Sequence, residues 1–164
     1  MTGELTTTQK FLDRIEGIVQ AHGFVRTKDQ FVRDCAGSLL LQRLSFIGSD
    51  PRSKTLITHP VLSLAFRSDR RPTPETTFGL WLAEFGARFQ FEGANQISSY
   101  ADASANFRWF ELFEEVFTHV VARLDPILSD RAKLRAFLSS DPHFSRRQDL
   151  IAKIDDLPAC PQGS

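Results

Sequence analysis

The segment NFRWFELFEEVFTHVVARL, residues 106–124, decides the fold. Its apolar residues recur at spacings of three and four, the period of an α-helix that buries one face. That stripe consists of Trp109, Leu112, Phe113, Val116, Phe117, Val120, Val121 and Leu124. The opposite, solvent-exposed side is formed by Arg108, Glu111, Glu114, Glu115, Thr118 and Arg123. The segment therefore predicts the main core helix, and Asp125-Pro126 is expected to end it.

A second amphipathic helix is predicted near the N-terminus. Apolar residues recur at helical spacing from Phe11 onward, and residues 6–8 are threonines that can cap the first turn. Gly23 stands where a left-handed C-terminal cap is typical, and Phe24 follows it as the apolar contact of such a cap. The helix is therefore expected to stop at His22 or Gly23.

Between these two helices the apolar period changes to two, as in half-buried antiparallel strands. A short turn at residues 27–29 precedes the first of three expected strands. These strands lie near residues 30–34, 38–47 and 55–67. Pro60 within the third implies an edge position, a bulge, or a strand that starts at Val61.

Further strands are expected after a proline-containing loop at residues 70–74. Residues 78–82 and 87–91, on either side of Gly86, predict two strands. Residues 80–85 could instead form one helical turn. The strands are the favoured interpretation.

Two short helices are expected after the core helix, and Ser129 and Ser145 can each cap one of them. The chain is thus predicted to form a single α+β domain over residues 1–157, followed by a flexible C-terminal tail, residues 158–164. Its antiparallel sheet of four to five strands is packed on one face by the N-terminal helix and the long helix, with the short C-terminal helices beside them.

The composition excludes several classes of protein. With 41% hydrophobic and 24% charged residues among 164, the chain is average for a soluble globular domain and is not disordered, collagenous or coiled-coil. No apolar run approaches the roughly 18 to 20 residues of a membrane-spanning helix, and the N-terminus lacks the pattern of a secretory signal. A soluble cytoplasmic protein with no membrane partner is predicted. Its 15 phenylalanines are expected to fill the core.

Residues that carry chemistry are few and scattered. There is no glycine-rich phosphate loop, His-Glu-x-x-His pair or nucleophile elbow, and Cys35 and Cys160 lack the spacing of a zinc site. None of the four histidines falls in a metal-binding pair, and His119 is expected to be an exposed partner of Glu115. Only His59 is kept as a candidate site residue. We therefore expect no cofactor and no metal, and a non-enzymatic function is favoured.

Several segments, taken in order, resemble a bacterial family. They are a first helix ending in Gly-Phe, a basic hairpin containing Phe, the sequence LQRLSF at residues 41–46, the apolar strand 61–66 and a long helix ending in Leu-Asp-Pro. Over residues 11–138 the chain resembles the domain-of-unknown-function family 4304. The resemblance implies an α+β fold and no established activity. Tryptophans of that family's strand region appear here as Phe or are absent, apart from Trp81.

Charge is segregated along the chain, although the net charge is zero. Residues 23–74 contain nine basic and four acidic residues, whereas residues 75–128 contain three basic and eight acidic ones. The predicted sheet is therefore basic and the long helix acidic. Four arginines on one exposed face or edge of the sheet could bind a phosphate-bearing or acidic protein partner. Alternatively, the basic residues of the sheet form ion pairs with the carboxylates of the helix within the fold.

Three functions remain open from the sequence. The favoured one is a non-enzymatic bacterial protein-binding module, such as an immunity or antitoxin-like protein that neutralises a toxin partner. Its candidate binding residues are Arg43, Arg67, Arg70, Arg71 and His59. The second is a nucleic-acid-associated domain that stacks Phe rings and uses Arg26, Lys28, Arg33, Arg43, Arg52 and Lys54. The third is an uncharacterised enzyme with a site assembled from distant residues, including His59.

Overall fold

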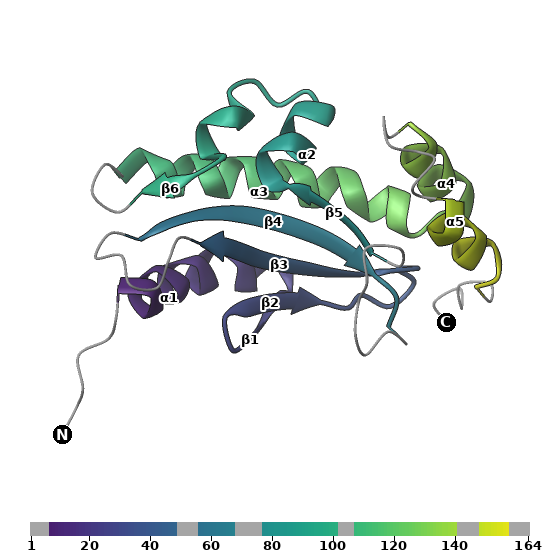
Figure 1. Ribbon diagram of the computed structural model, residues 1–164, viewed down its shortest axis with the longest axis horizontal. Helices are drawn as coiled ribbons and strands as arrows, with labels where there is room; N and C mark the ends of the chain where they lie inside the picture. The colour runs from purple at the N-terminus through teal and green to yellow at the C-terminus, as the bar shows by residue number, and fades with distance from the viewer. Residues whose placement is uncertain (1–6, 49–55, 68–76, 102–106, 141–147, 158–164) are drawn as a thin grey trace.

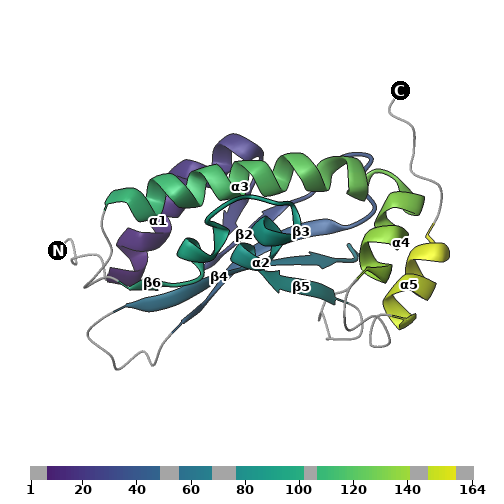
Figure 2. The ribbon, with the colours of Figure 1, turned by 90° about the horizontal axis from the view of Figure 1, so that it is seen from above.

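Two helices, α1 (Thr7–Val19) and α3 (Phe107–Leu128), lie along one face of an antiparallel sheet (Figure 1 and Figure 2). The structure, a computed structural model, describes residues 7–48, 56–67, 77–101, 107–140 and 148–157. Two shorter helices, α4 (Arg131–Ser139) and α5 (Gln148–Asp155), lie at the C-terminal end of α3. This arrangement confirms the predicted α+β fold class.

Five of the six strands of the sheet form a meander, in which each strand pairs antiparallel with the next along the chain. In spatial order its strands are β1 (Val25–Thr27), β2 (Gln30–Arg33), β3 (Leu41–Gly48), β4 (Ile57–Ala65) and β5 (Thr77–Trp81). The segment before α3 adds a 3-10 helix, η2 (Ala94–Ile97), and a short strand, β6 (Tyr100–Ala101), which pairs with the start of β4.

Pro60 lies inside β4 and pairs only with Phe46 of β3. On the other side of β4, the β6 pairing ends at Thr58 and the β5 pairing begins at Val61. Pro60 therefore occupies a local edge between two neighbouring strands, where its missing N–H breaks no ladder. The edge position was one of the predicted alternatives.

The inner face of the sheet packs against α1 and α3. Leu44 and Leu62 of the middle strands are fully buried, and so are Phe113 and Phe117 of α3, whose rings stack 5.6 Å apart. Each phenylalanine side chain that the structure describes belongs to this core or packs against it. The composition therefore correctly predicts a core filled with rigid rings, and burial of this apolar surface is the main stabilising contribution.

The end of α1 confirms the predicted left-handed cap. The helix continues as one 3-10 turn, η1 (Gln20–His22), and Gly23 follows with φ +86°. The Gly23 N–H donates to the Gln20 carbonyl at 3.0 Å, and the Phe24 N–H donates to the Val19 carbonyl at 3.4 Å. Glycine adopts this conformation without the cost that a Cβ would impose.

Helix α2 (Leu82–Arg88) replaces the strand expected at residues 87–91, so that prediction is wrong. The apolar residues that α2 buries have helical spacing, and its fit depends on Gly86. A Cβ at Gly86 would lie 2.7 Å from the Ala94 Cβ and 3.0 Å from Val116 Cγ1 of α3.

His119 of α3, expected to be an exposed partner of Glu115, is half-buried instead, and its Nε2 lies 2.8 Å from the Phe89 carbonyl oxygen.

The hairpin at residues 25–33 contains a strand that the sequence analysis missed. β1 pairs antiparallel with β2, and Val25 lies opposite Val32. The two strands are joined by the expected turn, in which Lys28 has φ +60°. β1 is only three residues long, and its Val25 side chain is 68% exposed. A strand this short carries too little alternation to be recognised from sequence.

Pro126 does not end α3, contrary to expectation, and the helix continues to Leu128. Leu124 and Leu128 are both buried, so the last turn gains contacts with the core. The Leu128 carbonyl accepts a hydrogen bond from the Leu39 N–H at 2.8 Å, and Ser129 Oγ donates to the Pro126 carbonyl at 3.2 Å. These contacts offset the one intrahelical hydrogen bond that a proline near a helix end removes.

The short C-terminal helices form as predicted, but the first has a different cap. Asp130 is its N-cap residue, and Asp130 Oδ1 accepts a hydrogen bond from the Lys133 N–H at 3.1 Å. Ser129 is thereby displaced from the capping position expected for it. Ser145 and the expected flexible tail, residues 158–164, lie outside the described residues.

Replacement of Phe113 or Phe117 by Ala is expected to lower the free energy of unfolding by about 3 to 5 kcal/mol, because each ring is fully buried. Urea and thermal unfolding followed by circular dichroism measure the loss. Glu114→Ala, on the exposed side of the same helix, should change stability by less than about 0.5 kcal/mol. A melt unchanged by both phenylalanine substitutions would contradict the packing.

Gly86→Ala is expected to destabilise the fold by about 1 to 3 kcal/mol, although alanine is the better helix former, because its methyl group would overlap Ala94. The matched control is Gly17→Ala in α1, where no atom lies within 4 Å. That change should stabilise by about 0.5 to 1 kcal/mol. Denaturant midpoints measure both effects, and the same sign for both would refute the close packing of α2.

Candidate functional site

The candidate site is the side of the sheet that faces away from α1 and α3, here called the outer face. Side chains alternate along a strand, and residues paired across antiparallel strands point to the same side. The printed register therefore identifies the outer face as Val25, Thr27, Gln30, Val32, Leu41, Arg43, Ser45, Ile47, Ile57, His59, Val61, Ser63, Ala65, Thr77, Gly79 and Trp81. In the part of the chain that the structure describes, no helix is packed across this face (Figure 1).

The outer face carries the exposed large hydrophobic side chains found in the described part of the chain. Among the described residues, four large hydrophobic side chains are exposed: Val25 (68%), Ile47 (55%), Trp81 (42%) and Ile57 (39%). All four lie on this one face. Single exposed apolar residues are common on any protein, but their concentration on one face indicates an interaction surface.

Arg43 lies at the centre of the outer face. It belongs to β3, the middle strand of five, and the register places Val25, Val32, Arg43, Ser63 and Gly79 in one row across the sheet. No described carboxylate forms an ion pair with Arg43, and no strand position of the outer face is acidic. The centre of the face therefore carries a positive charge without an intramolecular counter-charge among the described residues.

His59 lies on the same face, beside the exposed tryptophan. Its Nδ1 is 2.9 Å from the Ser98 carbonyl oxygen, a contact that requires a proton on Nδ1 and leaves Nε2 as the acceptor of the neutral ring. The His59 ring meets Trp81 edge-on, with centroids 4.6 Å apart. The histidine is therefore held in one orientation and supports the exposed indole.

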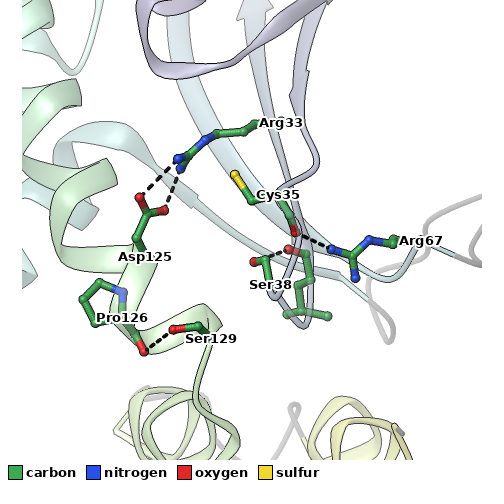
Figure 3. Close-up of polar contacts among 8 residues, drawn as sticks. Arg33, Cys35, Ser38, Arg67, Asp125, Pro126 and Ser129 are labelled. Atoms are coloured by element: carbon green, nitrogen blue, oxygen red, sulfur yellow. Dashed lines mark hydrogen bonds and ion pairs between the residues drawn. The ribbon is translucent and has the colours of Figure 1, made fainter. Parts of the chain in front are cut away.

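Arg67, another predicted binding residue, is engaged within the fold. Its Nε donates to Asp34 Oδ1 at 2.5 Å, and its terminal nitrogens reach the carbonyls of Cys35 at 3.0 Å and Leu39 at 3.5 Å. These contacts hold the connection between β2 and β3, and Figure 3 shows the one with the Cys35 carbonyl. Of the five predicted site residues, Arg43 and His59 thus lie on the same outer face, two rows apart along the strands. Arg70 and Arg71 lie outside the described residues.

Two other arginines of the sheet form ion pairs with carboxylates of the helices. Arg33 of β2 donates to both oxygens of Asp125 in α3, at 2.6 and 3.2 Å, and its side chain is 14% exposed (Figure 3). Arg26 of β1 contacts Asp13 at 2.5 Å and Glu16 at 3.1 Å, both in α1. The basic sheet and the acidic helices are therefore joined by ion pairs on the inner side, one of the alternatives left open by the sequence.

Arg33 remains charged throughout the usual pH range. Burial lowers the pKa of Arg33, but the hydrogen bonds and the charge of Asp125 outweigh burial, so the pKa is raised. A raised pKa means that the stabilising charge is present at every pH below the ordinary arginine value and is lost only above the raised value. Arg33 itself therefore adds no pH dependence to stability near neutrality.

Sequence reasoning missed the exposed apolar members of this surface. Trp81 and Ile47 were taken only as strand residues, and Val25 lies in the strand that was missed. A usable signal was present in β3, where both faces carry apolar residues and Ile47 lies on the same face as Arg43. That pattern is typical of a strand whose second face also meets a partner.

Neither a membrane span, a metal site nor a known relative assigns a function to this chain. No described helix is long and apolar enough to cross a membrane. Within the same residues, no group of three or more His, Cys, Asp or Glu side chains could hold a metal ion. No family model, curated protein or solved structure matches this chain. The resemblance to the domain-of-unknown-function family 4304 therefore stays a prediction.

Asp125→Ala is expected to lower the free energy of unfolding by about 1 to 3 kcal/mol, because it leaves the largely buried Arg33 guanidinium without its acceptor. The loss of unfolding free energy should lie near the lower end of this range, because the Asp125 side chain is 45% exposed. Urea unfolding of this variant is compared with Arg123→Ala, an exposed change on the same helix. Equal stability of the two variants would show that the ion pair contributes nothing.

Proposed function

We propose that this chain is a non-enzymatic protein-binding module that uses the outer face of its sheet. The observation that supports this is that the four exposed large hydrophobic side chains of the described residues all lie on the face that carries Arg43. Protein interfaces combine an apolar centre with tryptophan and arginine anchors, and these residue types most often dominate the binding energy. Trp81 and Arg43 supply both kinds of anchor.

A nucleic-acid function receives less support from the same geometry. Nucleic-acid affinity depends on several cations that can reach phosphates together. Arg26 and Arg33 are engaged by carboxylates of the chain, and Arg43 lies amid apolar and small neighbours. Lys28 is exposed in the turn between β1 and β2, and Arg52 and Lys54 lie outside the described residues. A protein surface with an apolar centre fits the outer face better.

The more specific form of this function is an immunity or antitoxin-like protein that neutralises a toxin. Such a protein needs only an exposed surface complementary to its target, without catalytic groups of its own. The outer face meets that requirement, and the identity of the partner stays a prediction.

Trp81→Ser and Ile47→Ser are expected to weaken partner binding at least tenfold, because each removes an exposed apolar contact. Wild-type and variant chains capture proteins from the native host, and quantitative mass spectrometry identifies proteins lost by these variants only. The identified protein is then purified and its Kd measured by calorimetry. Arg123→Glu, on the helical side, is the control and should bind like the wild type.

Two results would argue against the proposed function. One is a purified partner whose Kd is unchanged by both serine substitutions while the variants remain folded. The other is micromolar binding of fluorescent DNA or RNA that weakens steeply between two salt concentrations, because counterion release produces that dependence. The second result would favour the nucleic-acid alternative.

A further inference from the structure

The outer face combines an apolar surface with a charge of one sign. Its strand positions include Arg43 and His59 but no aspartate or glutamate. The two cross-strand neighbours of Arg43 are Val32 and Ser63, and neither can neutralise a guanidinium. A partner that covers this face must therefore supply the counter-charge or leave a buried cation unpaired, which is costly.

Small residues beside Arg43 leave room above its side chain. Ser63 and Gly79 continue the Arg43 row, and Gly79 lies so close to Ser63 that a Cβ would come within 2.9 Å of Ser63 Oγ. In the next row Val61 and the larger Trp81 rise beside these small residues. Arg43 thus shares its row with a low part of the face, and the exposed Trp81 belongs to the next row.

We infer that the outer face binds an acidic protein segment whose carboxylate pairs with Arg43 while an adjacent apolar side chain packs on Trp81. The inference rests on the proposed function and names the chemistry of its partner. The planar guanidinium matches a carboxylate with two parallel hydrogen bonds, so the pair fixes the register of the segment. Opposite charge at the centre of an apolar interface also rejects basic partners.

A second copy of this chain does not meet the same requirement. If two outer faces packed across a two-fold axis at their centre, Arg43 would face the Arg43 of the other copy. Repulsion between these cations disfavours self-association through this face. The partner is therefore a different protein with carboxylates next to apolar residues.

A phage-displayed library of random 16-residue peptides tests the inference without knowledge of the natural partner. The library is selected in parallel on the full-length wild type, Arg43→Glu, Trp81→Ser and the control Arg123→Glu. Peptides enriched on the wild type and on the control should carry Asp or Glu close to aromatic or aliphatic residues. Peptides enriched on Arg43→Glu should no longer be rich in acidic residues, and peptides enriched on Trp81→Ser should no longer be rich in apolar ones.

Synthetic versions of the enriched peptides then give the size of the effect. Fluorescence polarisation should show at least tenfold weaker binding to Arg43→Glu, an intermediate loss with Arg43→Lys, and less than a twofold change with Arg123→Glu. Circular dichroism melts confirm that each variant is folded. Replacing the peptide's acidic residue by phosphoserine tests whether phosphate, rather than carboxylate, is the preferred anion.

Each outcome decides a separate question. Binding that needs Trp81 but is indifferent to Arg43 or to the peptide's acid overturns this inference and leaves the proposed function standing. Tenfold tighter binding of the phosphoserine peptide overturns the carboxylate assignment. If no peptide is enriched, or if enrichment depends on neither residue, a short acidic segment is not the ligand. The proposed function itself fails only if the captured partner is indifferent to Trp81 and Ile47.

Discussion

Burial of the apolar stripe of α3 against the inner face of the sheet is the interaction on which the rest of the structure depends. Phe113 and Phe117 fill the space above the inward leucines of β3 and β4, and none of these side chains is accessible to solvent. The other elements are positioned relative to this contact. α2 approaches α3 closely through Gly86, and Arg33 reaches Asp125 only because β2 lies beneath the C-terminal half of α3.

The same contact determines which surface is left for a partner. Strand side chains alternate, so the strands that direct leucines toward α3 must direct a second set of residues the other way. In the described part of the molecule no second layer of helices covers that set, and Trp81 and Ile47 remain exposed around Arg43. Exposed apolar surface around a lone cation is a poor arrangement for an isolated monomer and a suitable one for an interface.

Part of the candidate site could be recognised from sequence alone. Arg43 was identified from the excess of basic residues in the sheet segment, and His59 from its position within a strand beside Pro60; both lie on the outer face. The role of Arg67 could not be recognised, because its partner Asp34 is 33 residues away, in the connection that follows β2. Trp81 was missed because a tryptophan in an apolar strand looks the same in sequence whether it points inward or outward.

By itself the sequence determined those features in which neighbouring residues act together. Helical and alternating periods specified α1, α3 and the main strands, and Gly23 specified a cap, because these signals extend over a few turns or residues. Only the tertiary structure decided that α3 continues through Pro126, that α2 is a helix, and which arginines are engaged. These features depend on burial and ion pairing between residues that are far apart in the sequence. Arg33 and Asp125, for example, are 92 positions apart.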